Sequence, residues 1–192
     1  MNHGLSRKEE IRRVAARMFF AKGYAATSMR DLASAVGIKQ SALYHHYPSK
    51  LDLLFDITKQ GQIDLMLAVE KETTAAATTI EELNAFISTH IRYTLTRRGE
   101  SGLAVEMRHL DEPKQVEMRK LNKEYIESLR EIMTRGIREG VLRPCNVRFV
   151  SLILLNSATF TTAWYDPNGA LSIDEMIVIF MDQTWRGLLD DR

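Results

Sequence analysis

Residues 27–50 combine side chains that can bind nucleic acid, in the order T-S-M-R-D-L-A-S-A-V-G-I-K-Q-S-A-L-Y-H-H-Y-P-S-K. Gln40 could form a bidentate pair with adenine, and Lys39 could donate to guanine, with Ser41 beside them as a third candidate base reader. Hydroxyl, imidazole and ammonium groups are typical donors to phosphate oxygens. The candidates of that kind are Thr27, Ser28, Tyr44, His46 and Lys50. The segment is therefore predicted to bind DNA, with base contacts supplying the sequence preference.

Some residues of this segment have alternatives that do not involve DNA. His45 is a further candidate DNA contact, and a surface or interhelical position is equally open for it. Tyr47 is expected to be a core aromatic rather than a stacking platform, and Lys50 taken alone would more often be solvated surface. DNA binding is therefore inferred from the whole group of residues and not from any single one.

The apolar residues of the same stretch indicate the elements that must position the polar ones. The positions that fit two short helices meeting at an angle are Leu32, Ala33, Val36, Ile38 and Leu43. Ala33 is small where the helices must approach closely, and Gly37 follows where a sharp turn needs a positive φ. This pattern predicts a helix-turn-helix, whose second helix can enter the major groove.

Charge is unevenly distributed along the 192 residues, although the whole chain carries only +1. The first 50 residues contain nine Lys/Arg and three Asp/Glu, which gives +6, whereas the other 17 basic and 22 acidic residues give −5. A basic solvated surface would explain the charge alone. The asymmetry also suits an anion-binding module, with DNA the obvious partner, joined to a body without that role.

The rest of the chain shows helical periodicity and no sustained alternation, so the fold class is expected to be all-α with about nine helices. All four prolines fall at expected breaks between helices. Two S-x-x-E/D patterns, at residues 6–9 and 28–31, are typical of capped helix starts. The helices are expected at about residues 6–22, 28–36, 39–46, 49–73, 80–98, 103–110, 113–140, 147–165 and 172–189.

The stretch L-Y-H-H-Y-P-S-K at residues 43–50, with A-x-x-x-G-I at 33–38, closely resembles the operator-binding domain of the TetR family. The resemblance covers about residues 6–55. One departure is Lys39, where the family usually has a serine or threonine that caps the recognition helix. The resemblance implies a homodimer in which residues 1–50 bind DNA and residues 51–192 form a helical ligand-binding and dimerisation domain. Its two recognition helices would lie roughly 34 Å apart, which implies a palindromic operator in double-stranded DNA.

The last two expected helices agree with dimerisation, which in this family uses a four-helix bundle. Residues 147–165 and 172–189 carry apolar faces larger than one subunit's core obviously needs. An ordinary intrachain core is the alternative explanation. We therefore expect a homodimer through the last two helices.

Polar groups on otherwise apolar helix faces mark the effector pocket that the resemblance implies. The candidate ligand-binding residues are Phe86, His90, Met107, Arg108, Leu121, Tyr125, Leu129, Asn156, Phe160 and Trp164. Flexible methionines suit an adaptable apolar cavity, although core packing would explain each residue taken singly. The expected partner is a small, mostly apolar effector.

Two later stretches resemble, less specifically, the KstR and FadR types of TetR-family repressor. They are G-x-x-x-G-x-L-R at residues 136–143 and W-Y-D-P-N-G at residues 164–169. Several of those repressors respond to acyl-CoA thioesters, so the resemblance makes an acyl-CoA a candidate effector. The cations that could bind its phosphates are Arg92, Arg97, Arg98, Arg119, Lys120 and Lys123.

The sequence favours no catalytic, metal or cofactor site, because it lacks a phosphate-binding glycine loop, an H-E-x-x-H cluster and a G-x-S-x-G elbow. His90, Glu106, Arg108 and His109 could be imagined as an enzyme site, but their spacing does not demand one. The single Cys145 excludes an intrachain disulfide. No signal-peptide core or membrane-spanning run is present, so a cytoplasmic protein without a membrane partner is expected. The alternatives left open are a TetR-type activator, a drug-efflux regulator sensing another hydrophobic ligand, and a helical interaction module.

Overall fold

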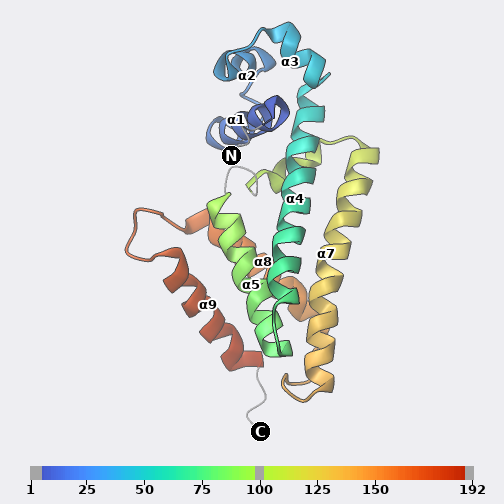
Figure 1. The fold of residues 1–192 in the computed structure, drawn as a ribbon, viewed down its shortest axis with the longest axis vertical. Helices are drawn as coiled ribbons and strands as arrows, with labels where there is room; N and C mark the ends of the chain where they lie inside the picture. Colours follow the sequence, from blue (N-terminus) through green and yellow to red (C-terminus); the bar gives the residue numbers. More distant parts are fainter. Residues whose placement is uncertain (1–5, 98–101, 189–192) are drawn as a thin grey trace. The chain divides into compact units, whose positions relative to one another are not determined.

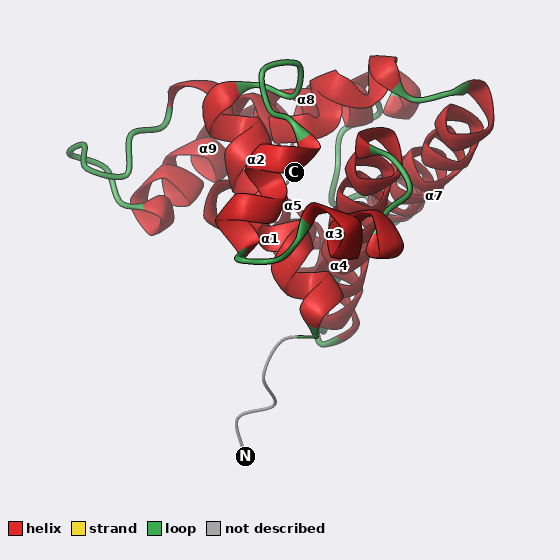
Figure 2. Ribbon diagram, turned by 90° about the horizontal axis from the view of Figure 1, so that it is seen from above, coloured by secondary structure: helices red, strands yellow, loops and turns green. Residues whose placement is uncertain are grey.

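The computed structural model describes residues 6–97 and 102–188, and every regular element within them is a helix (Figures 1 and 2). The elements are α1 (Arg7–Lys22), α2 (Met29–Val36), α3 (Gln40–His46), α4 (Lys50–Thr74), α5 (Thr79–Thr96), η1 (Gly102–His109), α7 (Glu112–Arg138), α8 (Val147–Trp164) and α9 (Ile173–Leu188). The all-α prediction is confirmed. The described residues contain eight α-helices rather than about nine, because the short helix expected over 103–110 is the 3₁₀ helix η1.

Side-chain caps determine where the first two helices begin. The Ser6 hydroxyl accepts a hydrogen bond from the Glu9 N–H at 3.2 Å, and the Glu9 carboxylate accepts one from the Ser6 N–H at 2.7 Å. Ser28 and Asp31 repeat this arrangement at α2. Each cap satisfies N–H groups that have no partner inside the helix, and its hydrogen bonds lower the pKa of Glu9 or Asp31. The two predicted starts are confirmed.

The chain forms two compact units. The first combines Met1–Gln62 with Arg97–Arg119, and the second combines Ile63–Thr96 with Lys120–Arg192. The sequence led us to expect a single boundary after residue 50, and this division differs from that expectation. The units are discontinuous because α4 and α7 each contribute residues to both, and because the connection between α5 and α7 belongs with the N-terminal helices.

Side-chain contacts bind the residue 102–119 segment to the N-terminal helices of the first unit. η1 contacts α1, and the His109 ring stacks on Tyr24 with the ring centroids 5.4 Å apart. The Lys114 ammonium bridges the carboxylates of Asp52 and Asp111 at 3.2 and 2.7 Å. Lys59 of α4 pairs with Glu117 at 2.6 Å. The helix-turn-helix therefore folds together with a segment that follows it by about fifty residues in the sequence.

Helix α5 is central to the second unit, where it packs against both α8 and α9 (Figure 1). Its core face is made of Leu83, Phe86, Ile87 and Ile91, which are all at most 1% exposed. Their helical spacing puts them on one side of α5, as the sequence pattern predicts. Polar contacts add to this core, among them the hydrogen bond from the Trp185 indole to the Asn84 side chain at 2.6 Å.

Candidate DNA-binding and effector-binding sites

The outer face of α3 carries the side chains that the sequence predicts to read DNA bases. Leu43 is the buried residue of this helix, and it anchors α3 against the buried face of α2, which carries Leu32, Ala33 and Val36. Gly37 ends α2 with a left-handed backbone (φ 74°), which turns the chain sharply into α3 at little steric cost. The polar side chains left exposed around α3 are Lys39, Gln40, Ser41, Tyr44, His45 and His46. The structure thus brings the predicted base readers together on one solvent-facing helix.

The start of α3 has no side-chain cap. Lys39 occupies the N-cap position and its side chain makes no capping hydrogen bond. A helix start of this kind leaves backbone N–H groups free, and such groups attract phosphate oxygens. The departure noted in the sequence therefore removes a cap and adds an exposed ammonium group at the same point.

Thr27 and Ser28 use their hydroxyl groups inside the protein. Thr27 is 1% exposed, and its hydroxyl donates to the Gly23 carbonyl at 2.9 Å. The Ser28 hydroxyl donates to the Asp31 carboxylate at 2.6 Å within the α2 cap. The phosphate roles predicted for these hydroxyl groups are not supported, because each donor already has an intramolecular acceptor.

The Lys50 side chain also has partners inside the protein. Its ammonium group lies 2.8 Å from the Tyr24 carbonyl, 2.9 Å from the Thr27 carbonyl and 3.5 Å from the Ala25 carbonyl. It also lies over the Tyr24 ring, 4.3 Å from its centroid. An ammonium group has three donors, and here three carbonyls of the α1–α2 turn face it. The structure therefore assigns Lys50 to holding this turn, in place of the phosphate contact expected from its residue type.

Tyr47 is 3% exposed, as expected for a core aromatic. Its hydroxyl donates to the Asp56 carboxylate at 2.6 Å, and Lys8 and Arg12 pair with the same carboxylate. Burial and the hydrogen bond to Asp56 raise the pKa of Tyr47. The end of α3 is thus tied to both α1 and α4.

Four of the predicted ligand-binding residues meet in the core of the second unit. Phe86 and Tyr125 stack with their ring centroids 5.0 Å apart, beside Leu129, which is fully buried. The His90 ring stacks on Tyr125 and its Nδ1 lies 2.8 Å from the Tyr125 hydroxyl oxygen. Its Nε2 lies 2.9 Å from the hydroxyl oxygen of Thr159, a residue that is not among those predicted from the sequence. Burial lowers the pKa of His90 to about 4, so the imidazole is neutral near pH 7.

The other predicted ligand-binding residues do not join this group. Asn156 is exposed, and its amide donates to the Leu152 carbonyl of its own helix. Phe160 and Trp164 are 65% and 56% exposed on α8. Leu121 is half-buried one turn before Tyr125 on α7. Half-buried Met107 and exposed Arg108 belong to η1 of the first unit.

Among the described residues, three of the cations proposed for acyl-CoA phosphates have acidic partners. Arg92 pairs with Asp174, and Arg119 pairs with Glu112. Lys120 lies 3.9 Å from Glu124. Arg97 and Lys123 are exposed, and Arg98 lies outside the described residues.

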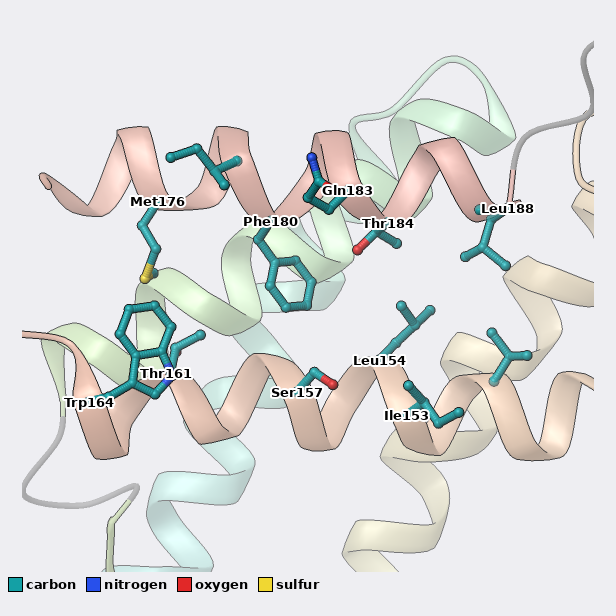
Figure 3. Close-up of a pocket in the computed structure, with 13 residues that line it drawn as sticks. Ile153, Leu154, Ser157, Thr161, Trp164, Met176, Phe180, Gln183, Thr184 and Leu188 are labelled. Atoms are coloured by element: carbon teal, nitrogen blue, oxygen red, sulfur yellow. The ribbon is translucent and has the colours of Figure 1, made fainter.

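An apolar groove runs between α8 and α9 of the second unit, with a volume of about 530 Å³. Figure 3 shows Phe180 of α9 and Trp164 of α8 directed into the space between the helices. The same helices expose further large apolar side chains, namely Phe149, Leu152, Ile153, Phe160, Val178 and Ile179. Several large exposed apolar side chains on two helices that share an apolar groove are typical of a protein–protein interface.

Two negative findings apply to the part of the chain that the structure describes. No group of three or more His, Cys, Asp or Glu side chains there is arranged to hold a metal ion. No helix in those residues has both the length and the apolar character required to cross a membrane.

Two family models match the chain. The model for bacterial regulatory proteins of the tetR family matches residues 11–57, and the model for the tetracyclin repressor-like C-terminal domain matches residues 76–188. Between them they account for both the helix-turn-helix and the larger helical part.

Individual proteins are similar over nearly the whole length. The HTH-type transcriptional repressor KstR2 of Rhodococcus jostii (strain RHA1) is 27% identical over 188 residues, which cover 95% of this chain and 91% of that protein. The solved structure of the TetR family regulator PfmR from Thermus thermophilus is 30% identical, with a TM-score of 0.87 over 97% of this chain and 99% of that one. AibR, solved in complex with isovaleryl coenzyme A and operator DNA, is 25% identical, with a TM-score of 0.84 over 95% and 98%.

Proposed function

The chain belongs to the TetR family of bacterial regulatory proteins, and we propose that it is a ligand-controlled transcriptional repressor that binds a palindromic operator as a homodimer. The observation that carries this proposal is the exposed face of α3, where Lys39, Gln40, Ser41 and Tyr44 are held outward by the buried Leu43. Gln40 and Lys39 supply the donors and acceptors that read a base edge. Tyr44 and His46 supply phosphate donors.

Dimerisation in this proposal uses the outer faces of α8 and α9. The apolar groove between these helices, together with exposed Phe160 and Trp164, supports an isologous contact with the same surface of a second copy. A two-fold dimer presents two α3 helices to successive major grooves of a palindromic site.

The effector in this proposal is a small apolar molecule or an acyl-CoA, whose acyl group is apolar. AibR was solved with isovaleryl coenzyme A, and the buried stack of Phe86, His90 and Tyr125 combines apolar rings with a few polar atoms, as the linings of effector pockets do. Helix α4 contributes residues to both units. Effector binding would favour a conformation in which α4 moves the helix-turn-helix units of the two subunits apart. Operator affinity would then fall by the ratio of the effector affinities of this conformation and the DNA-binding one.

DNA recognition is tested by footprinting the region upstream of the protein's own gene, followed by titrations of operator and random DNA. Gln40→Ala is expected to cost about 1–3 kcal/mol on the operator and to relax the preference at one base pair. Tyr44→Ala is expected to weaken binding to both DNAs about equally, as for a phosphate contact. Equal losses on both DNAs for both variants would contradict the assignment of Gln40 to a base.

The effector class is tested by adding acyl-CoAs and the corresponding CoA-free acids to the protein–operator complex. At least one thioester is expected to release the operator. If every thioester leaves the complex intact, the acyl-CoA proposal is wrong, although DNA binding by α3 would still stand.

A further inference from the structure

A three-member hydrogen-bonded chain crosses the core of the second unit from α7 through α5 to α8. Tyr125 and His90 are 6% and 4% exposed, whereas Thr159 at the other end is only partly buried. The Nδ1 of His90 is 2.8 Å from the Tyr125 oxygen, and its Nε2 is 2.9 Å from the Thr159 oxygen. Both nitrogens of the imidazole are therefore in use.

The protons of this chain can be counted. A neutral imidazole donates from one nitrogen and accepts at the other, and each hydroxyl donates one proton. The three groups hold three protons but have only two hydrogen bonds between them. One hydroxyl proton is left over, and it must lie at one end of the chain, on Tyr125 or on Thr159.

Burial decides which end carries the spare donor. A buried donor without an acceptor costs about 1–3 kcal/mol, and among the described residues His90 is the only side-chain partner found for the Tyr125 hydroxyl. Tyr125 therefore donates to Nδ1, the Nε2–H donates to Thr159, and the Thr159 hydroxyl keeps its proton free at the less buried end.

Thr159 differs in this respect from other threonines in the helices. The hydroxyl groups of Thr94 and Thr161, for example, donate to a carbonyl of the preceding helical turn. The Thr159 oxygen instead faces His90, and among the described residues no bond to its own helix accompanies that contact. Its proton is thus available to an acceptor other than Tyr125 and His90.

We infer that the Thr159 hydroxyl, oriented by His90 and Tyr125, is a specificity-determining donor that receives a neutral carbonyl oxygen of the effector. The inference rests on the effector proposed above and specifies its recognition. A carbonyl needs only one donor, which is what the site offers. A carboxylate would need a compensating cation, but His90 is neutral and Arg130 and Arg135 of α7 are paired with Glu127 and Glu82. The site therefore favours a thioester, ester or ketone over the free acid.

The test compares thioesters with thioethers in which CH₂ replaces the carbonyl group, and it measures binding calorimetrically without DNA. The probes are isovaleryl- and octanoyl-CoA, their alkyl-CoA counterparts, and the same two pairs on N-acetylcysteamine. The wild-type protein is expected to bind the thioester about three- to tenfold more tightly, which is the net value of one hydrogen bond. Thr159→Val should reduce this ratio to about one. Two control variants should preserve the ratio. Thr159→Ser keeps the hydroxyl, and Thr94→Val removes a buried hydroxyl that is not hydrogen-bonded to Tyr125, to the His90 ring or to Thr159.

A second measurement uses the wild-type protein, so its outcome does not depend on whether a variant folds. Nitrogen-15 NMR of labelled histidine in the intact protein should show His90 protonated at Nε2 and unprotonated at Nδ1 near pH 7. The Nδ1-protonated tautomer, or equal affinity for thioester and thioether, would overturn the inference while leaving an acyl-CoA effector in place. Absence of binding by every probe would reject the effector class and the inference with it.

Discussion

Hydroxyl groups around the helix starts of the first unit and polar groups in the core of the second unit bond partners at very different sequence distances. In the first unit, the hydroxyl groups of Ser6, Ser28 and Thr27 bond residues three or four positions away. In the second unit, His90 bonds Tyr125 and Thr159, which are 35 and 69 positions away, and Trp185 bonds Asn84 across 101 positions. The helix starts of the first unit are therefore specified locally, whereas the candidate effector site forms only after the second unit has packed.

The exposed surfaces of the units differ as well. Around α3 the exposed side chains are mostly polar, as a surface that contacts DNA requires. On α8 and α9 they include Phe149, Phe160, Trp164 and Val178, each more than half exposed. One surface suits a charged, hydrated partner and the other suits a second apolar protein surface, and variants in each region separate the two roles.

The largest effect is expected for Phe160→Ala on dimer assembly. Each subunit would lose about 1.5–3 kcal/mol of apolar burial, and the two copies together would weaken dimerisation by about a hundred- to ten-thousandfold. Sedimentation velocity over a range of concentrations measures the change. The matched control is Phe20→Ala, since Phe20 is 47% exposed on α1 and should leave assembly unchanged. Unaltered sedimentation of both variants would exclude Phe160 from the interface.

Leu43→Ala should lower the free energy of unfolding by about 2–5 kcal/mol, because Leu43 is fully buried and is the anchor of α3. Urea denaturation followed by circular dichroism measures the loss. Leu67→Ala removes a leucine that is 57% exposed, and it should change the stability by less than about 0.5 kcal/mol. Similar losses in the two variants would argue against a packed α3.

Acid should destabilise the second unit through His90. The pKa of His90 is about 4 in the folded chain and about 6.5 in an unfolded one, so the unfolded chain binds more protons between these pH values. The free energy of unfolding should therefore fall by about 2 kcal/mol between pH 7 and pH 5. His90→Gln lacks this titration, and the difference between the two urea-denaturation profiles isolates it. A difference that does not change with pH would mean that His90 is not buried as a neutral group.

The smallest effect is expected for Lys50→Met, which removes the donor shared by three carbonyls of the α1–α2 turn. A loss of about 1–2 kcal/mol in unfolding free energy is expected, because hydrogen bonds from a charged group are partly offset by solvent at this half-buried site. Lys39→Met, at an exposed position, should leave stability within about 0.5 kcal/mol of wild type. If Lys50→Met were equally harmless, the contacts of Lys50 with the turn would contribute nothing to stability, and its predicted phosphate contact would remain open.

The regions also differ in how much of them the sequence predicts. The helix starts at Ser6 and Ser28 are correct because a capping box is complete within four residues, and the exposed α3 face follows from short apolar spacing. The contacts of Lys50 could not be predicted in this way, because its residue type fits phosphate binding equally well and the carbonyls that it contacts lie in a turn 23–26 positions earlier.

Features that depend on contacts between distant parts of the sequence are harder to predict from it. Thr159 carries no local signal, because its importance comes from an imidazole 69 positions away. Phe160 and Trp164 were placed in the effector pocket because α8 is apolar on several faces. Periodicity does not say which of these faces points inward.

The residue 102–119 segment, which packs with the N-terminal helices through His109, Lys114 and Glu117, bears on how this protein can be recombined. A helix-turn-helix is often treated as a cassette that can be exchanged between regulators by a single crossover. Here a crossover after α4 would separate Tyr24, Asp52 and Lys59 from their own partners in that segment, and a crossover after α3 would separate Tyr24 from His109. A functional chimera would need two further crossovers, so that residues 102–119 come from the same parent as the N-terminal helices that they contact.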